Sequence, residues 1–208
     1  MPVRVKICGI TRVEDALFAE RLGAFAVGFV FHPRSGRYIR PADAGHIARA
    51  LGPGIMKVGV FVNDDPATVR TIVAEAGLTA VQFHGDETPE YVREFSDLKV
   101  IKVFRVGDGF DPGCIRAYSE GLFLLDTMIA GAYGGTGKPF DWRVAASCRS
   151  YGSIIIAGGL TPLNVDEAIR TTEPWGVDVS GGVEVSSGIK DHAAMNAFFN
   201  AVRSVARE

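Results

Sequence analysis

Polar and ionisable residues alternate with apolar ones in several short segments of this chain of 208 residues. Because side chains two apart in a strand point to the same face, each polar set would share one face of its strand. The polar set contains Lys6, Cys8, Gln82, His84, Asp126, Asp178 and Ser180. A thiol, an imidazole and carboxylates are groups that general acid–base catalysis uses, which makes the set a candidate catalytic cluster. The alternative is a set of buried polar groups that satisfy one another, with Lys6 paired to Asp178.

Cys8 itself has two interpretations. A free cysteine is most often a small buried hydrophobic residue. Beside Lys6, Cys8 could instead be a thiolate of lowered pKa that acts as a base or a nucleophile. The remaining cysteines, Cys114 and Cys148, fall in segments of helical pattern and are interpreted as structural. The chain has no Cys and His spacing typical of a metal site, so we expect no metal ion.

Short segments rich in Val, Ile and Phe predict the buried parallel strands that would carry these residues. They are Val3–Cys8, Ala26–Phe31, Lys57–Val62, Ala80–His84, Val100–Arg105, Leu122–Asp126, Ser153–Ala157 and Val177–Ser180. Between the strands, capping side chains and prolines predict where helices begin. These positions are Thr11-x-x-Glu14, Pro41, Asp65-Pro66, Thr88-Pro89, Asp111-Pro112, Asp141, Thr161-Pro162 and Asp191.

Eight units of strand and helix divide the chain into 208/8, or about 26 residues each, which is long enough for both elements and two short loops. The pattern predicts a single α/β domain over residues 1–208, folded as a (β/α)8 TIM barrel. An open doubly wound sheet is the alternative, although the first strand runs into Cys8-Gly9-Ile10-Thr11 and not into G-x-G-x-x-G. In a barrel, the polar set would face the axis, close to the carboxyl ends of the strands where such enzymes keep their active sites.

Two pairs of glycines follow the last two predicted strands, namely Gly158-Gly159 and Gly181-Gly182. Glycine lets backbone N–H groups approach an anion, and these two loops are a frequent phosphate site of the barrel fold. Each pair taken alone is also typical of a tight turn. Together they favour a phosphate site.

Two other loops have open interpretations. Arg37 follows the second predicted strand and could hold a carboxylate, or could simply be solvated. Segment 128–139 contains Gly134-Gly135-Thr136-Gly137-Lys138, which is not a Walker A motif because Pro139 follows the lysine and the first glycine is missing. It is either an active-site lid or a flexible surface loop.

The overall composition excludes several classes of function. With 22 Lys and Arg against 24 Asp and Glu, the chain has no excess of positive charge, and we expect no nucleic-acid partner. The longest apolar stretch, Ala24–Phe31, is far shorter than the roughly 20 residues that span a bilayer, and we expect no membrane contact. No signal-peptide pattern opens the chain, so we expect a cytoplasmic protein. We also expect a monomer or a homodimer.

Several motifs together resemble the phosphoribosylanthranilate isomerase family of tryptophan biosynthesis. They are Lys6-Ile7-Cys8-Gly9-Ile10-Thr11, Gly28-Phe29-Val30-Phe31, Gly59-Val60-Phe61-Val62-Asn63, Val81-Gln82-Phe83-His84-Gly85, Leu125-Asp126, Gly134-Gly135-Thr136-Gly137-Lys138, Phe140-Asp141-Trp142, Ala157-Gly158-Gly159-Leu160, Val177-Asp178-Val179-Ser180 and Gly188-x-Lys190-Asp191. They cover nearly the whole chain, and a set of motifs in this order is highly specific.

The resemblance implies a cofactor-free enzyme whose partner is a small phosphoribosyl substrate. It would convert N-(5-phosphoribosyl)anthranilate to 1-(2-carboxyphenylamino)-1-deoxyribulose 5-phosphate by an Amadori rearrangement. In that family pattern, Cys8 matches the general base, Asp126 the general acid and Arg37 the residue that holds the anthranilate carboxylate. The expected remaining substrate-binding residues are Gln82, His84, Gly158, Gly159, Asp178, Ser180, Gly181 and Gly182. For His84, the roles of polar neighbour and proton relay both stay open.

The chain departs from the family at two of these positions. The family commonly reads V-D-V-S-S-G-V-E, whereas Gly181 replaces the second Ser here, and we expect looser phosphate binding at most. Phe83 stands where an aliphatic residue is usual and should matter only to packing. Two other functions are kept as alternatives: a lyase or aldolase acting on a phosphosugar through a Schiff base on Lys6 or Lys102, and a phosphoribosyl-binding barrel without catalysis.

Overall fold

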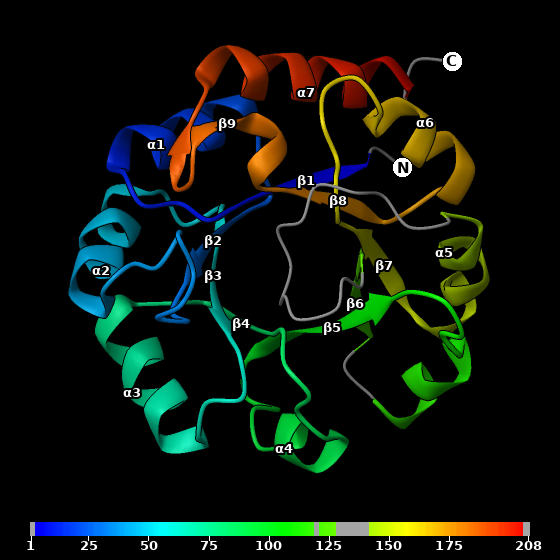
Figure 1. Cartoon of the computed structure of the whole chain (residues 1–208). Coiled ribbons are helices and arrows are strands. Elements are labelled where there is room, and N and C mark those ends of the chain that lie inside the picture. Colours follow the sequence, from blue (N-terminus) through cyan, green and yellow to red (C-terminus); the bar gives the residue numbers. More distant parts are fainter. Residues whose placement is uncertain (1–2, 119–120, 128–141, 206–208) are drawn as a thin grey trace.

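The computed structural model describes residues 3–118, 121–127 and 142–205, and its strands form a closed parallel barrel (Figure 1). The strands are β1 (Arg4–Cys8), β2 (Ala26–Val30), β3 (Met56–Phe61), β4 (Ala80–Phe83), β5 (Lys99–Val106), β6 (Leu122–Thr127), β7 (Ser153–Ile156) and β8 (Gly176–Val179). Each pairs with the next, and β8 pairs with β1, so that Lys6 is in register with Asp178. The predicted strands and the TIM barrel are confirmed, and the open-sheet alternative is wrong.

Helices surround the barrel, as Figure 1 shows. They are α1 (Val13–Leu22), α2 (Pro41–Ala50), α3 (Pro66–Ala76), α4 (Pro89–Arg93), α5 (Trp142–Cys148), α6 (Val165–Thr172) and α7 (His192–Val205), with 3-10 helices η1 (Pro112–Ala117), η2 (Arg149–Tyr151) and η3 (Gly181–Val183). Between β8 and α7 lies a small antiparallel hairpin, β9 (Glu184–Ser186) and β10 (Ile189–Lys190). In Figure 1 this hairpin lies beside α1 at the mouth of the barrel.

Several predicted caps begin helices by satisfying backbone N–H groups that have no partner within the helix. The Asp65 side chain accepts from the N–H of Thr68 at 3.0 Å, and Thr88 accepts from Tyr91 at 3.3 Å. Asp191 accepts from Ala193 at 2.8 Å at the start of α7. These predictions are confirmed, and the prolines that follow the caps occupy first-turn positions where a missing N–H costs nothing.

Two predicted helix starts are wrong, and Asp141 lies outside the described residues. The Thr11 hydroxyl caps no helix but donates to the carbonyl of Gly188, in the β9–β10 turn, and α1 begins at Val13. The predicted cap at Thr161-Pro162 is also wrong, because α6 begins only at Val165. The Thr161 hydroxyl instead accepts a hydrogen bond from the N–H of Leu163, in a turn before the helix. In both cases the side chain has a better partner outside the predicted cap.

The core has an inner and an outer layer, which follow the predicted alternation along the strands. The barrel interior contains Ala26, Val58, Ala80, Ile101, Val103, Leu124, Ile155 and Ala157. The outer layer, between strands and helices, includes Ile7, Phe83 and Val179. Phe83 is fully buried there, and the centroid of its ring lies 4.9 Å from that of Phe95, which agrees with a packing role. The polar residues of the opposite parity therefore point into the barrel.

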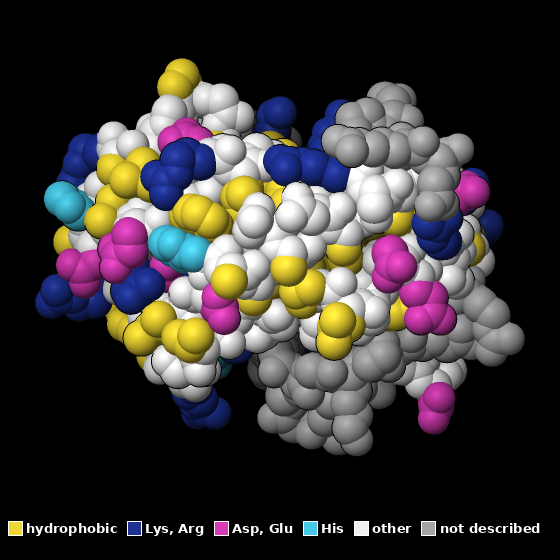
Figure 2. Space-filling model, turned by 90° about the horizontal axis from the view of Figure 1, so that it is seen from above, with side chains coloured by type: hydrophobic (Ala, Val, Ile, Leu, Met, Phe, Trp, Pro, Cys, Tyr) yellow, Lys and Arg dark blue, Asp and Glu magenta, His cyan; other side chains and the backbone are white. Residues whose placement is uncertain are grey.

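The surface seen from above carries charges of both signs among apolar and neutral side chains (Figure 2). This distribution fits the formal net charge of −2. None of the described helices is long and apolar enough to cross a membrane.

Candidate active site

The carboxyl ends of the strands surround a cavity of about 730 Å³. Lys6 of the polar set does not line this cavity, whereas the other candidate catalytic and binding residues do: Cys8, Arg37, Gln82, His84, Asp126, Gly158, Gly159, Asp178, Ser180, Gly181 and Gly182. Cys8 is the last residue of β1 and Asp126 the last but one of β6, and β7 and β8 lie between these two strands. A thiol and a carboxyl group therefore approach the same space from different sides.

Lys6 and Asp178 form a buried ion pair on the inner face of β1 and β8. The Lys6 Nζ lies 3.0 Å from Asp178 Oδ1, and the lysine side chain has no exposed surface. Burial alone would lower the pKa of Lys6, but the carboxylate of Asp178 and the nearby Cys8 more than compensate, and its pKa is raised. Lys6 therefore stays an ammonium ion that is paired with the carboxylate of Asp178.

Cys8 is buried beside this ion pair, and its pKa differs from the sequence expectation. Burial raises the pKa of the thiol, although the charges of Lys6 and Lys190 oppose this shift. Burial outweighs the two ammonium groups, and Asp178 beside Lys6 further disfavours a thiolate, so the interpretation of Cys8 as a thiolate of lowered pKa is wrong. The absence of a side chain at Gly28 on β2 makes room for the thiol, because a Cβ there would lie 2.8 Å from Cys8 Sγ.

Asp126 is 5% exposed and faces His84. His84 Nε2 lies 3.2 Å from Asp126 Oδ2, and His84 Nδ1 lies 3.3 Å from the amide nitrogen of Gln82. The three side chains form a row from β4 to β6 along the cavity wall. The contact of His84 Nε2 with Asp126 lies within ion-pair distance but does not have the geometry of a hydrogen bond, so His84 is close to the carboxyl group without being hydrogen-bonded to it.

The two glycine turns lie together at the ends of β7 and β8. Gly158 and Gly159 have φ values of 81° and 70°, which favour glycine. Asn164 holds this turn, because its side chain donates to the Gly159 carbonyl at 3.0 Å. A Cβ on Gly182 would collide with the carbonyl oxygen of Leu160. The backbone can thus come close to a ligand at this edge, as a phosphate site requires.

Gly181, where the family commonly has Ser, lies next to Arg37. A Cβ at this position would be 3.2 Å from Arg37 Nη2, so a side chain here would press on the guanidinium group. The Ser180 Oγ is buried and has no hydrogen-bond partner among the described residues. It is therefore available to an incoming ligand.

Two charged residues next to Arg37, Glu184 and Lys190, were not among the site residues predicted from the sequence. Glu184 forms an ion pair with Arg37 at 2.8 Å, and Lys190 forms another with Glu184 at 2.6 Å. Both side chains come from the β9–β10 hairpin, which has no strong apolar pattern in the sequence. Their only sequence signal was their membership of the V-E and Gly188-x-Lys190-Asp191 motifs.

Lys102 is not placed where a Schiff base could form with a ligand in this cavity. It points outward from β5, where its Nζ lies 2.8 Å from Glu87 Oε2 and donates to the Gly85 carbonyl at 2.9 Å. With Lys6 paired to Asp178, both lysines of the Schiff-base alternative have other partners. In the part of the chain that the structure describes, no three His, Cys, Asp or Glu side chains gather as a metal site.

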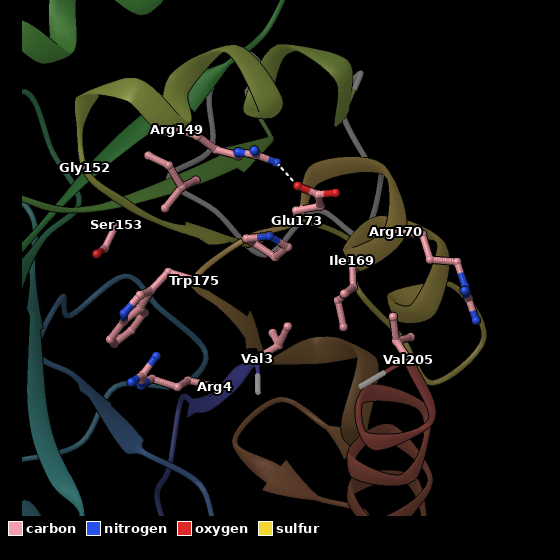
Figure 3. A pocket seen from close by; sticks show the side chains of 12 residues that line it. Val3, Arg4, Arg149, Gly152, Ser153, Ile169, Arg170, Glu173, Trp175 and Val205 are labelled. Carbon is pink, nitrogen blue, oxygen red and sulfur yellow. Dashed lines mark hydrogen bonds and ion pairs between the residues drawn. The ribbon is translucent and has the colours of Figure 1, made fainter. Parts of the chain in front are cut away.

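A second pocket, of about 650 Å³, lies at the opposite end of the barrel (Figure 3). The guanidinium group of Arg4 stacks over the Trp175 ring, 4.4 Å from its centroid. Arg149 forms an ion pair with Glu173 across the pocket wall. None of the candidate catalytic residues lines this pocket. Segment 128–139, interpreted as a lid or a surface loop, lies outside the described residues.

The closed parallel barrel, with ionisable side chains and two glycine turns at the carboxyl ends of its strands, defines an enzyme of the TIM-barrel class. Residues 5–201 match the family model described as PRAI, N-(5'phosphoribosyl)anthranilate (PRA) isomerase. The chain belongs to this family, as the resemblance implied, and is an isomerase of tryptophan biosynthesis.

Individual relatives agree with this assignment. The N-(5'-phosphoribosyl)anthranilate isomerase of Geobacter sulfurreducens is 50% identical over 198 residues, covering 94% of this chain and 96% of the relative. The phosphoribosyl anthranilate isomerase structure from Thermus thermophilus is 38% identical, with a TM-score of 0.90 over 98% of this chain and 100% of that one. A further isomerase structure, 40% identical with a TM-score of 0.84 over 97% and 99% of the two chains, is a complex with reduced 1-(o-carboxyphenylamino)-1-deoxyribulose 5-phosphate.

Proposed function

We propose that the chain converts N-(5-phosphoribosyl)anthranilate to 1-(2-carboxyphenylamino)-1-deoxyribulose 5-phosphate by an Amadori rearrangement, with Asp126 as general acid and Cys8 as general base. The observation that carries this proposal is the single cavity that Cys8 and Asp126 line together with both glycine turns. A related isomerase structure is a complex with the reduced form of this product, which supports the choice of substrate.

The first half of the reaction is a proton transfer from Asp126. The carboxyl group gives its proton to the ribose ring oxygen, the bond between this oxygen and C1 breaks, and the anthranilate nitrogen forms a double bond to C1. This opens the ring to a protonated Schiff base. His84 Nε2, 3.2 Å from Asp126 Oδ2, is close enough to support this proton transfer in our proposal.

In the second half, the Cys8 thiolate removes the proton from C2. The electrons of this C–H bond move to the positively charged imine, giving an enolamine, which tautomerises to the ketone product. One proton is given and one is taken, so the reaction is an isomerisation without a redox partner. A positioned acid or base of this kind typically contributes on the order of 10²–10⁴ in rate.

The ends of the substrate that do not react supply the orientation. In our proposal the backbone of the two glycine turns and Ser180 bind the phosphate, and Arg37 binds the ring carboxylate. Asp178 has one oxygen bound to Lys6, which leaves the other to accept from a ribose hydroxyl. Gln82 and His84 line the sugar between the ends. Binding energy from both ends can then hold the ribose between acid and base.

We further propose that the enzyme works in the cytoplasm, with no nucleic-acid or membrane partner. Its mixed surface charge and its small-molecule cavity support this proposal.

The test is turnover of freshly made N-(5-phosphoribosyl)anthranilate, measured as the loss of its fluorescence. We expect Cys8→Ala and Asp126→Asn each to lower kcat by about 10²–10⁴-fold while the far-UV circular dichroism is unchanged. Near-complete activity in both variants would show that the roles are wrongly assigned. Absence of turnover in the unmodified chain would favour the binding barrel, and trapping of an adduct by borohydride would favour the Schiff-base enzyme.

A further inference from the structure

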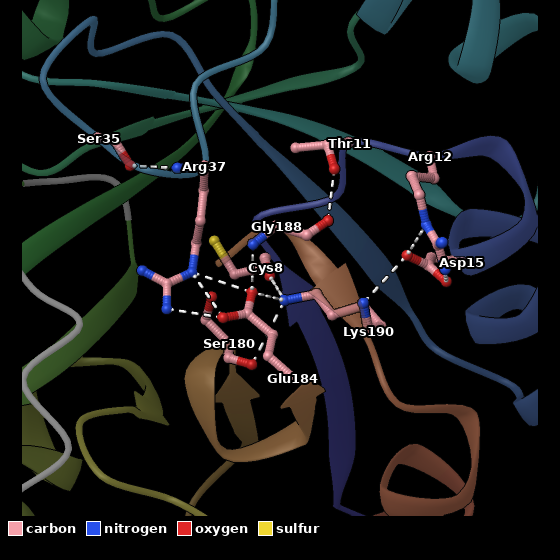
Figure 4. Close-up of polar contacts among 10 residues, drawn as sticks. All are labelled: Cys8, Thr11, Arg12, Asp15, Ser35, Arg37, Ser180, Glu184, Gly188 and Lys190. Carbon is pink, nitrogen blue, oxygen red and sulfur yellow. Dashed lines mark hydrogen bonds and ion pairs between the residues drawn. The ribbon is translucent and has the colours of Figure 1, made fainter. Parts of the chain in front are cut away.

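The β9–β10 hairpin carries two buried charged residues that contact Arg37 and Cys8, two residues of the cavity lining. Glu184 is the first residue of β9, and Lys190 is the last of β10. Their side chains are 4% and 0% exposed, which is unusual for charged residues. Figure 4 shows these two side chains next to Arg37 and Cys8. Cys8 is the last residue of β1, and Arg37 lies in the loop between β2 and α2.

Glu184 grips one edge of the Arg37 guanidinium group. Arg37 Nε donates to both carboxylate oxygens, at 3.0 and 3.1 Å, and Nη2 donates to Oε2 at 2.8 Å. The remaining nitrogen, Nη1, points away from Glu184 in Figure 4 and has no acceptor among the described residues. A guanidinium group that binds one carboxylate along one edge can still donate hydrogen bonds to a second carboxylate from its remaining N–H groups.

Lys190 holds Glu184 from the opposite side. Its Nζ lies 2.6 Å from Glu184 Oε1 and donates to the carbonyl oxygens of Cys8 and Ser180 at 2.5 and 3.3 Å. These three acceptors use all three N–H groups of the ammonium ion. Its backbone N–H also donates to the buried Asp15 at 3.1 Å. Lys190 therefore has little freedom, and it fixes the carboxylate that fixes Arg37.

The charges of this group suit one anionic ligand. Arg37 and Lys190 are positive and Glu184 is negative, which leaves one net positive charge. A single ring carboxylate would neutralise it. If Glu184 lost its charge, the two cations would repel each other, and Arg37 is the one that can move because its side chain is still 18% exposed.

We propose that Glu184 is the positioning residue for recognition of the ring carboxylate: it holds Arg37 in the geometry that binds this group. This inference rests on the proposed function, since it assumes the aromatic acid as substrate. The ordering of a long, flexible side chain is then completed before the ligand arrives, which lowers the entropic cost of binding. Neither Glu184 nor Lys190 touches the reacting atoms in this proposal.

The test compares two ligands on Glu184→Gln, which keeps the side-chain shape and removes the charge. One probe is reduced 1-(o-carboxyphenylamino)-1-deoxyribulose 5-phosphate, and the other is the same compound without the ring carboxyl group. We expect the Kd of the first to rise about tenfold and that of the second to change less than about twofold, in line with loss of a charged hydrogen bond. Isothermal titration calorimetry measures both.

A purely structural role predicts a different pattern, in which both ligands lose affinity equally. That result, or an unchanged Kd for the carboxylated probe, would overturn the proposal. In an Arg37→Ala background, Glu184→Gln should cause no further loss, because the residue that Glu184 positions is gone. If the losses multiply instead, Glu184 acts independently of Arg37 and the proposal is wrong.

Two further variants complete the design. Glu173→Gln removes a carboxylate of the same kind at the opposite end of the barrel and should leave both Kd values unchanged. Glu184→Asp keeps the charge and should retain more carboxylate selectivity than the Gln variant, and it serves if the latter does not fold. Ligand selectivity and turnover are independent readouts. A chain that binds selectively but does not turn over would contradict the proposed function and leave this inference standing.

Discussion

Cys8 experiences opposing influences from its surroundings. The barrel interior disfavours a thiolate, whereas the ammonium groups of Lys6 and Lys190 favour one, and burial has the larger effect. Lys6 contributes less than its proximity suggests because Asp178 lies 3.0 Å from it. Since only the thiolate can remove a proton from carbon, the proposed base is a minority form in the free protein near neutral pH.

This leads to a titration that can be measured directly. We expect the ultraviolet absorbance of the Cys8 thiolate, taken as the difference between the unmodified chain and Cys8→Ala, to appear above the pH at which an ordinary cysteine ionises. The sign follows from a raised pKa: the neutral thiol persists to higher pH. A transition below the ordinary range would contradict this and would restore the expectation of an activated thiolate.

Residue roles differed in how far they could be predicted from the sequence. The polar alternation around Cys8 and Asp126 was visible because a strand shows its two faces in neighbouring residues. The partner of Arg37 was not visible, since Glu184 is 147 positions away and only closure of the barrel brings them together. Lys102 shows the same limit, because β5 is largely apolar on both faces and its sequence does not reveal which face is inward.

At the scale of elements, local chemistry located the strands to within one residue but located the helices less well. A buried parallel strand is a short apolar run bounded by turns, which is a local property. The start of a helix depends on whether the capping side chain binds the first N–H groups of the helix or a partner elsewhere in the fold. Thr11 illustrates this, because its hydroxyl donates to Gly188 in the hairpin rather than capping α1.

The loop from β4 to α4 depends on one buried carboxylate. Glu87 accepts from the N–H groups of Asn63 and Gly85 at 2.9 and 3.0 Å, and from Lys102 at 2.8 Å. Replacing it with Gln leaves Lys102 buried without its counter-charge. We expect Glu87→Gln to lower the free energy of unfolding by about 3–5 kcal/mol.

Urea unfolding monitored by circular dichroism measures this difference. The matched control is Glu90→Gln, which removes a carboxylate three residues along the chain that is largely exposed and pairs with Arg93 at the surface. The control should leave the urea midpoint unchanged, because exposed pairs contribute little. Equal midpoints for both variants would mean that the buried pair adds nothing to the stability of this loop.

At the scale of the whole molecule, the number of units predicted the barrel, but its closure joins the first and last strands, far apart in the sequence. β1 and β8 meet in register at Lys6 and Asp178, whose ion pair lies at this seam. A packing role for this pair was one of the two sequence interpretations. In the folded chain Asp178 lines the cavity and Lys6 is fully buried beside it, so the two interpretations are compatible.

Asp178→Asn therefore tests closure of the barrel, and its effect should depend on pH. Near neutral pH we expect the variant to have a free energy of unfolding about 3–5 kcal/mol lower, because Lys6 keeps a buried charge without a partner.

The pH dependence follows from the pKa of Lys6. In the unmodified chain this pKa is raised, so the contribution of Lys6 to stability is complete below the unfolded pKa of 10.5 and is lost as the pH rises through the folded pKa. In the variant, burial lowers the pKa of Lys6, and stability recovers as the lysine deprotonates in the folded state. The difference between the two proteins should thus narrow from about pH 7 to about pH 10. Urea unfolding across this range measures it, with Asp97→Asn, whose carboxylate forms a surface pair with Arg70, as the control that shows no such trend. A constant or widening difference would mean that the charge of Lys6 is not what Asp178 stabilises at the seam.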